Sequence, residues 1–181
     1  MLITEEYRKM QQALHENPSY GMASLKFAPL VAHVIEATGA QELLDYGAGK
    51  GRLGLTLKTQ VKGPLEIRHY DPAIPEWAAP APPCELVACI DVLEHIEPGL
   101  LDNVLDDLKR VTLGVGVFTV HTAAAIKVLP DGRNAHLIQE SPEWWMPKFR
   151  ERFDVVRSES MPNGFWVIVQ SKRENADTPK V

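Results

Sequence analysis

Glycine is dense in residues 47–54, where four glycines follow a short run that ends with Asp45 and Tyr46. Glycine adopts positive φ angles without strain and lets a ligand lie close to the backbone. A phosphate-binding P-loop requires a lysine followed by serine or threonine, but Lys50 is followed by glycine and arginine. A dinucleotide site can be drawn through the same glycines, yet a carboxylate directly before them is unfavourable beside a pyrophosphate. We therefore expect the turn to hold a cationic ligand without phosphate.

Further polar residues stand where the chain leaves apolar, strand-like runs. Asp71 follows residues 65–70, Asp91 follows residues 85–90, and His121 ends a run that begins at residue 115. Ligands of parallel α/β sheets bind beyond the carboxyl ends of the strands. The site is therefore expected at these strand ends, together with the glycine turn.

These residues resemble the motifs of class I S-adenosylmethionine-dependent methyltransferases. LLDYGAGKGRLG matches the family pattern D/E-x-G-x-G-x-G, HYDP lies at the expected distance after it, and CIDVLEHI resembles the fourth-strand motif, all within residues 43–96. The resemblance implies S-adenosyl-L-methionine as cofactor and S-adenosyl-L-homocysteine as product. It also implies that Asp71 holds the ribose hydroxyls and that Asp45 lies near the ammonium group. The cofactor-binding residues it implies are Asp45, Gly47, Ala48, Gly49, Gly51, Asp71, Pro72, Asp91 and Val92.

The chain departs from the family between Asp71 and Cys84. The twelve residues PAIPEWAAPAPP include five prolines, which cannot form the helix and third strand usual in the family. The third strand is therefore expected to be missing or vestigial. Trp77 is the candidate for contacting adenine, because an indole stacks on a purine. The alternative is that Trp77 covers the exposed edge of the sheet.

The segment of residues 121–145 is expected to face the acceptor in a fold of this kind. His121 and His136 are candidate bases, and Asp91 joins them as a candidate catalytic residue at the top of its strand. Arg133 is a candidate anchor for an anionic group, although Asp131 and Gly132 beside it also form an ordinary turn signal. The candidate substrate-binding residues are Tyr20, Arg133, Asn134 and Trp144.

Glu94 and His95 allow two interpretations. In the first, D-x-x-E-H resembles the E-x-x-E-H of methyltransferases that bind a divalent metal, such as small-RNA 2′-O-methyltransferases and quinone O-methyltransferases, with His121 or His136 completing the site. Carboxylate and imidazole ligands suit Mg²⁺, Mn²⁺ or a related ion. In the second, the same string occurs in metal-free members and shapes the start of a helix. Because Asp91 replaces the first glutamate, we favour the second and expect no metal.

The elements that position these residues follow from periodicity and from cap residues. Helices are predicted at residues 4–16, 23–38, 51–59, about 98–111 and 141–152, and strands at 41–46, 65–70, 85–90 and 115–120. Residues 154–160 and 165–171 form a predicted hairpin with a turn at Asn163 and Gly164. This order predicts an α/β fold with a doubly wound, Rossmann-like, mostly parallel sheet that ends in an antiparallel hairpin.

Composition limits the class of protein. The 181 residues, 45% hydrophobic and 24% charged, suit one domain over residues 1–171, with helices in 1–38 covering the cofactor site and a disordered tail at 172–181. Cys84 and Cys89 suggest buried, reduced packing residues. No run approaches the roughly 20 apolar residues of a membrane helix, and the N-terminus lacks a secretory pattern. We expect a cytoplasmic protein without a membrane partner.

The predicted function is methyl transfer to a small-molecule or sugar-like acceptor. An RNA or tRNA acceptor is the alternative, but a net charge of −5 gives little general attraction for nucleic acid. A second alternative is a non-catalytic cofactor-binding sensor or partner subunit, because no separate substrate domain is evident. The oligomeric state is not indicated.

Overall fold

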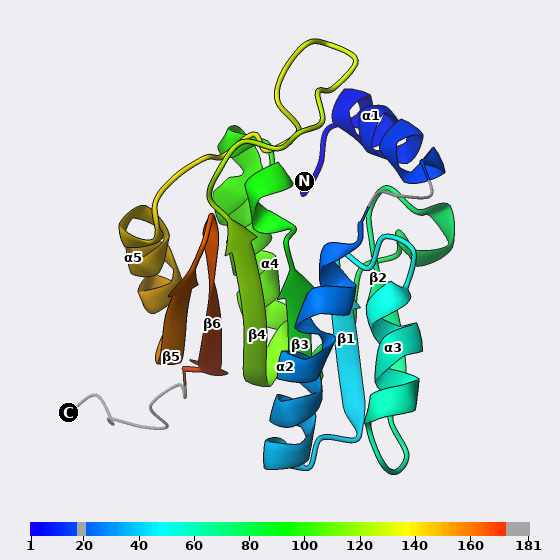
Figure 1. The fold of residues 1–181 in the computed structure, drawn as a ribbon, viewed down its shortest axis with the longest axis vertical. Helices are drawn as coiled ribbons and strands as arrows, with labels where there is room; N and C mark the ends of the chain where they lie inside the picture. The colour runs from blue at the N-terminus through cyan, green and yellow to red at the C-terminus, as the bar shows by residue number, and fades with distance from the viewer. Residues whose placement is uncertain (18–20, 173–181) are drawn as a thin grey trace, which may run out of the picture.

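Helices and strands alternate through residues 1–17 and 21–172, the part of the chain that the computed structural model describes (Figure 1). The helices are α1 (Glu5–Glu16), α2 (Ala23–Thr38), α3 (Arg52–Gln60), α4 (Leu101–Val111) and α5 (Pro142–Arg152). The strands are β1 (Glu42–Tyr46), β2 (Glu66–Tyr70), β3 (Cys84–Ile90), β4 (Thr112–His121), β5 (Phe153–Met161) and β6 (Gly164–Ser171). Single-turn 3₁₀ helices lie at Pro75–Trp77, Leu93–His95 and Pro98–Leu100. Tyr20 and all but the first residue of the predicted tail lie outside the described residues.

The strands form one sheet, which within the described residues has six strands in the order β2-β1-β3-β4-β6-β5. The four strands from β2 to β4 are parallel, and β6 lies antiparallel to both β4 and β5. Asn163 has a φ of 62°, and the hairpin closes where Met161 pairs with Gly164. The predicted fold class, a mostly parallel sheet with a terminal antiparallel hairpin, is confirmed.

The proline-rich segment after β2 contains no strand within the described residues 72–83, as predicted. It forms only the 3₁₀ turn at Pro75–Trp77, and the backbone N–H of Asp71 donates to the carbonyl of Trp77 at 3.1 Å. Proline lacks the N–H that a sheet ladder requires. The segment therefore folds back on itself, and β2 remains the edge of the sheet.

Two elements begin several residues away from the predicted position, whereas the other boundaries agree to within one residue. The helix expected from about residue 98 begins with the 3₁₀ turn Pro98–Leu100 and becomes α-helical only at Leu101. The strand expected at residues 115–120 spans Thr112–His121, since Thr112 already pairs with Cys84 of β3. Pairing with a neighbouring strand thus extends β4 through Gly114, which local propensity disfavours.

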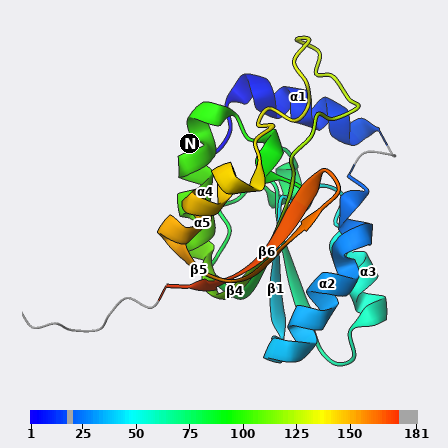
Figure 2. The same ribbon diagram turned by 60° about the vertical axis from the view of Figure 1, so that its left-hand side comes forward.

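The sheet separates two hydrophobic layers (Figure 2). One layer packs α2 and α3 against the sheet, with Phe27, Val31 and Leu57 among its buried residues. The other packs α4 and α5 against the opposite face, with Leu105 and Trp145 fully buried. Both layers hold the parallel strands in place, so that their carboxyl ends meet under α1 (Figures 1 and 2). Among the described residues, no helix has the length and apolar character needed to cross a membrane.

Candidate functional site

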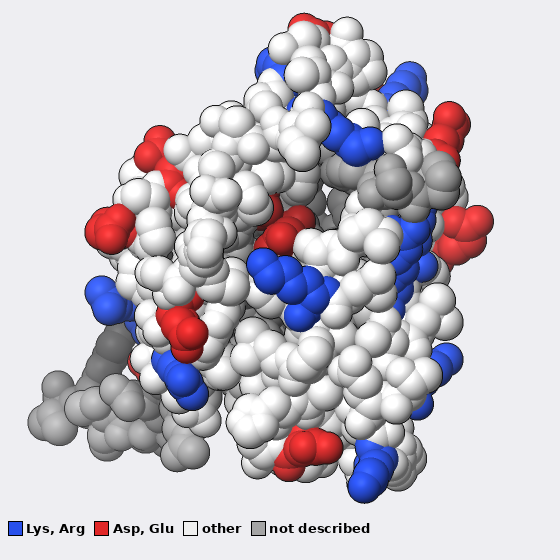
Figure 3. Space-filling model, in the orientation of Figure 1, with Lys and Arg blue, Asp and Glu red and all other residues white. Residues whose placement is uncertain are grey.

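A pocket of about 390 Å³ lies at the carboxyl ends of β1, β2, β3 and β4 and is bounded on its other side by α1. Figure 3 looks onto this hollowed face, where acidic and basic side chains both stand at the edge. Its volume falls within the range of roughly 300–1,000 Å³ that small-molecule sites occupy. The strand ends named in the sequence analysis are therefore brought together at one cavity.

The glycine turn forms one wall of this pocket. The backbone N–H groups of Gly47 and Ala48 donate to the carbonyl of Tyr70 at 2.7 and 3.0 Å, which ties the turn to the end of β2. Gly47, Gly49 and Gly51 all have positive φ, between 54° and 80°. A side chain at Gly47 would lie 2.4 Å from a methyl carbon of Val92. The turn therefore requires glycine at this position, where a side chain would overlap a residue of the pocket wall.

Asp71 directs a buried carboxylate at the pocket from the end of β2. Its Oδ2 accepts the backbone N–H of Gly49 at 2.9 Å, and its Oδ1 accepts that of Ala73 at 2.9 Å. The side chain is only 9% exposed. Each carboxylate oxygen has more than one lone pair. The two backbone donors therefore fix the orientation of the carboxylate and leave it able to accept hydrogen bonds from a ligand diol.

Asp45 is a second buried acid, at the end of β1. Its Oδ2 lies 3.5 Å from Nδ1 of His69 on the neighbouring strand. Burial raises the pKa of Asp45 above its usual value, the approach of His69 lowers it, and the nearby Asp71 raises it further. Among the described residues, this same Oδ2 is buried without a hydrogen-bond partner, although His69 lies beside it. Such an atom suits a ligand cation or donor.

Asp91 directly follows β3 and has a strained backbone conformation. Its φ is 51°, an uncommon value for a residue other than glycine. Its backbone N–H donates to Oγ1 of Thr119 at 2.8 Å, and the Thr119 hydroxyl in turn donates to its carboxylate. Burial raises the pKa of Asp91, which the Thr119 hydrogen bond partly opposes. The neighbouring strand β4 thus holds this carboxylate at the pocket wall.

Glu94 is fully buried beside Asp91. Its Oε1 accepts the backbone N–H of His121 at 3.0 Å, whereas its Oε2 has no hydrogen-bond partner within the described part of the chain. Burial raises the pKa of Glu94 well above its usual value, and the negative charge of Asp91 adds to the effect. A buried acceptor without a partner is costly, so Oε2 suits a bound proton, cation or ligand.

Three histidines line the pocket next to Glu94. The rings of His95 and His136 lie 4.7 Å apart, and those of His121 and His136 lie 4.8 Å apart. Nδ1 of His121 and Nδ1 of His136 both contact the carbonyl of Ala123, at 3.1 and 2.6 Å, and Nδ1 of His95 contacts that of Ala135 at 2.7 Å. A carbonyl only accepts hydrogen bonds, so each Nδ1 carries the proton. In the neutral form of such a ring, the lone pair is therefore on Nε2.

Burial keeps two of these rings uncharged near neutral pH. It lowers the pKa of His95 to about 4, with a further decrease from His136. It also lowers the pKa of His136 below the usual value. Glu94, His95 and His136 each offer a ligand atom, and these atoms lie within 4.8 Å of one another. The cluster can therefore accept a proton or hold a cation.

The structure brings most predicted site residues to the pocket. Its lining includes the following predicted residues: Asp45, Gly47, Ala48, Gly49, Asp71, Pro72, Asp91, Val92, Glu94, His95, His121 and His136. Gly51 does not line the pocket and instead forms the N-cap of α3. The first residues of both N-terminal helices also contribute lining atoms, among them Tyr7, Ala23 and Ser24.

Trp77 is not brought to the pocket lining. Its ring lies 4.5 Å from that of His69, centroid to centroid, and against Gly51. The hydrogen bond between its carbonyl and Asp71 turns this segment over the edge strand β2. In this position Trp77 covers the sheet edge, as the packing alternative expects.

The predicted substrate-binding residues also have other neighbours. Arg133 pairs with Asp131 at 2.6 Å and lies over the ring of Tyr7. Asn134 bonds through its side chain to both backbone groups of Ala125. Neither residue lines the pocket. Their contacts instead stabilise the loop after β4, which contributes other residues to the pocket lining.

Trp144 lies on α5, away from the pocket. Its ring packs against that of Trp145, and the ammonium of Lys148 lies 4.3 Å from its centroid. Tyr20 cannot be compared, since it lies outside the described residues.

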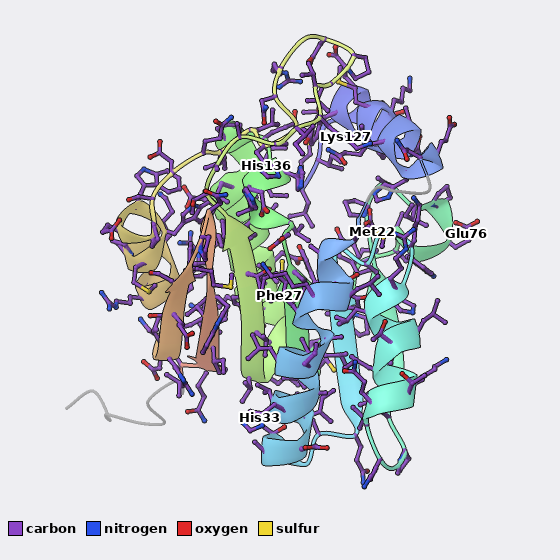
Figure 4. The ribbon with its side chains drawn as sticks, viewed as in Figure 1. Met22, Phe27, His33, Glu76, Lys127 and His136 are labelled. Atoms are coloured by element: carbon purple, nitrogen blue, oxygen red, sulfur yellow. The ribbon has the colours of Figure 1, made fainter. Side chains whose placement is uncertain are left out.

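The sequence predicts that helices of residues 1–38 cover the cofactor site, but it singles out no side chain of α1. His15, Tyr7 and Gln11 line the pocket, but in the sequence they are ordinary members of an amphipathic helix. Lys127, labelled with His136 in Figure 4, also lines it from the segment after β4. No local pattern marks these residues, because only the docking of α1 and of this segment brings them to the cavity.

Solved structures with a similar fold provide a comparison. The 1,6-didemethyltoxoflavin-N1-methyltransferase of Burkholderia thailandensis, solved with 1,6-didemethyltoxoflavin and S-adenosylhomocysteine, has a TM-score of 0.70 at 14% identity, over 94% of this chain and 91% of that one. Mitomycin 7-O-methyltransferase has a TM-score of 0.67 at 15% identity, over 90% of this chain and 60% of that one.

A third similar structure is magnesium protoporphyrin IX methyltransferase from Synechocystis PCC 6803 with bound S-adenosylhomocysteine. Its TM-score is 0.58 at 12% identity, over 92% of this chain and 94% of that one. No family model matches the chain, and no curated protein matches its sequence. At such low identity the similarity is one of fold.

Proposed function

We propose that this chain, whose fold is that of class I S-adenosylmethionine-dependent methyltransferases, binds S-adenosylmethionine and transfers its methyl group to a small-molecule acceptor. The observation that carries the proposal is the buried Asp71 carboxylate, oriented by two backbone N–H groups beside the glycine turn. A carboxylate accepts both hydroxyls of a ribose diol but repels phosphate. Asp45 supplies a second negative charge for the ammonium group of the cofactor.

The chemistry requires alignment more than activation. Methyl transfer from a sulfonium is a displacement with a good leaving group, so the protein mainly holds donor and acceptor in line and accepts a proton from the acceptor. His121 and His136 both line the pocket, and each has its Nδ1 on a backbone carbonyl, which leaves Nε2 to accept a proton. These two rings are the proposed bases. Asp91, which Thr119 holds in place, is proposed to line the site where the methyl donor meets the acceptor.

Cofactor binding is tested by thermal unfolding with S-adenosylhomocysteine. At about 100 times its Kd, the ligand would stabilise the chain by about 2.7 kcal/mol and raise Tm by roughly 5–10 °C. Asp71→Ala should weaken binding roughly 100-fold, because two hydrogen bonds to a charged group are lost. Asp154→Ala, at an exposed aspartate of β5, is the matched control and should bind as the wild type does. Equal binding by both variants would refute the proposal.

Acceptor class is tested by labelling. Methyl-labelled cofactor is added to a fractionated cell extract, with and without nuclease treatment. Label in small, nuclease-resistant products would support the proposal, whereas nuclease-sensitive label would indicate the RNA alternative. Intact cofactor binding with no transfer into any fraction would instead favour a sensor or partner subunit. His136→Gln and His121→Gln should each lower transfer by at least tenfold if that ring is the base.

A metal-assisted form of this reaction is the second candidate, favoured by one observation. Within the described residues, Oε2 of Glu94 is buried without a hydrogen-bond partner. The carbonyls that contact Nδ1 of His95 and of His136 place the lone pair of each neutral ring on Nε2. This is the arrangement in which histidines ligate metals. Glu94, His95 and His136 would hold a divalent ion such as Mn²⁺, which would lower the pKa of an acceptor hydroxyl.

The two candidates differ in the use of His136, since one lone pair cannot both bind a cation and accept a proton. Calorimetric titration of the chelator-treated protein with Mn²⁺ tests the second candidate. Glu94→Gln should abolish saturable binding, and Glu140→Gln, at an exposed glutamate, should not. If Mn²⁺ does not bind and chelator leaves transfer unchanged, the metal-assisted form is refuted and His136 remains a proposed base.

A further inference from the structure

The last turn of α1 lies directly on the glycine turn. Nε2 of His15 is 4.0 Å from Oδ2 of Asp71, and the two side chains are only 14% and 9% exposed. A side chain at Gly49 would come within 3.1 Å of Cε1 of His15. The imidazole thus occupies the wall of the cavity that faces the Asp71 carboxylate.

The other end of α1 is anchored on the opposite side of the pocket. The backbone N–H and the hydroxyl of Thr4 both donate to the carboxylate of Glu97 at 2.8 Å. The Tyr7 hydroxyl donates to the carbonyl of His95 at 2.6 Å, and Tyr7 packs with Leu129 in a small hydrophobic cluster. The helix therefore borders the pocket from the histidine cluster to Asp71, and it lies over the carboxyl ends of the parallel strands (Figures 1 and 2).

The separation between His15 and Asp71 is informative. A distance of 4.0 Å is too long for a direct hydrogen bond. It does suit one oxygen that lies between the two groups, at normal hydrogen-bond distance from each. A hydroxyl in this position donates to the carboxylate and accepts from an imidazole N–H.

We propose that His15 donates from Nε2 to the ribose hydroxyl that Asp71 accepts, so that α1 contributes a cofactor-positioning residue. This inference rests on the proposed function. In this role α1 would help to recognise ligands as well as cover the pocket. The same helix would contact the methyl donor through His15 and the histidine cluster through Tyr7. It also predicts selectivity: a ligand without the bridging hydroxyl loses the contact with α1 as well as that with Asp71.

Calorimetry with S-adenosylhomocysteine tests the inference. His15→Ala should weaken binding roughly tenfold, the usual effect of losing one hydrogen bond in a partly buried site. His15→Gln, whose amide can donate from a similar position, should recover part of the loss. His33→Ala is the control: His33 is an exposed histidine at the far end of α2 (Figure 4), and its loss should not affect binding.

The 2′-deoxy and 3′-deoxy analogues of S-adenosylhomocysteine separate a direct contact from a structural effect. One of them should lose more affinity for the wild type than for His15→Ala. The contact with Asp71 is lost in both proteins, whereas the contact with His15 can be lost only in the wild type. A His15→Ala affinity within twofold of wild type would overturn the inference. So would the finding that each analogue loses the same affinity for the wild type as for His15→Ala.

The outcomes also distinguish this inference from the proposed function. If Asp71→Ala loses binding while His15→Ala does not, the role of His15 fails and the proposed function stands. If the wild type does not bind S-adenosylhomocysteine, or if Asp71→Ala binds as well as wild type, both fail.

Discussion

Gly47 must be glycine for two separate reasons. Its φ of 80° is a conformation that side chains rarely adopt, and an added Cβ would lie 2.4 Å from Val92. Gly39 meets only the first condition. Its φ is 69°, and within the described part of the chain no heavy atom beyond its two sequence neighbours lies within 4 Å of where a Cβ would be. Comparing substitutions at the two positions therefore distinguishes the effect of backbone strain from that of steric overlap.

Alanine substitution at these glycines should have unequal effects. Gly39→Ala is expected to lower the free energy of unfolding by about 1 kcal/mol from the positive φ alone. Gly47→Ala should cost about 3 kcal/mol, because overlap with a packed side chain adds a further penalty. Urea unfolding of the two variants measures the difference. Equal losses would contradict the close approach of Val92.

The histidine cluster makes a prediction about protons. Carbonyl partners fix the proton on Nδ1 of His95 and His136, and burial lowers the pKa of His95 to about 4. In chelator-treated protein at pH 6, ¹⁵N shifts should therefore report a neutral His95 with an unprotonated Nε2. Because its pKa is lowered, the ring gains charge only near pH 4. A charged His95 at pH 6 would contradict the geometry.

At the scale of elements, the position of α1 depends on the contacts of its N-cap residue, Thr4. The Thr4 side chain caps Tyr7 N–H at 3.3 Å and also bonds Glu97, whereas Ser141, the N-cap of α5, makes no capping bond with its side chain. Both residues occupy the same position in their helices. Only Thr4, however, joins its helix to a distant segment of the chain.

Thr4→Ala should therefore loosen α1 more than Ser141→Ala loosens α5. Thr4→Ala should lower the free energy of opening of α1 by about 1–2 kcal/mol, because the cap and the side-chain hydrogen bond to Glu97 are both lost. Hydrogen exchange of the amides in both helices provides the measurement. If both helices exchange as in the wild type, the contact with Glu97 does not hold α1 over the pocket.

At the scale of the whole molecule, both cysteines lie in one hydrophobic layer. Cys84 and Cys89 are 1% and 0% exposed, and burial raises the pKa of each thiol. This confirms their prediction as buried, reduced packing residues. A reagent can reach either thiol only when the core opens, because both are buried. The raised pKa values also reduce the fraction of thiolate, which is the reactive form.

Thiol labelling should accordingly report global unfolding. At pH 8, an aromatic disulfide reagent should react with the native protein no faster than the protein unfolds, and with both thiols at once in denaturant. The rate of labelling across a urea series, compared with the unfolding rate measured by fluorescence, tests this expectation. Rapid labelling of either thiol in native buffer would show local opening around β3.

The sequence alone determined the order of elements and the location of the pocket. Apolar periodicity, glycine and proline act over a few residues, so β1, β3 and the missing strand after Asp71 were all predictable. Parallel strands end at one edge, and this rule put Asp45 and Asp91 at the same cavity as Asp71.

The tertiary structure alone decided which side chains meet there. His95, His121 and His136 are joined by carbonyls in the loop after β4. His15 lies near Asp71 because α1 docks over the pocket through Thr4 and Tyr7. Trp77 and Trp144, by contrast, have packing roles that the sequence did not distinguish from binding. Local propensity depends on neighbours along the chain, whereas convergence depends on long-range docking that no short pattern records.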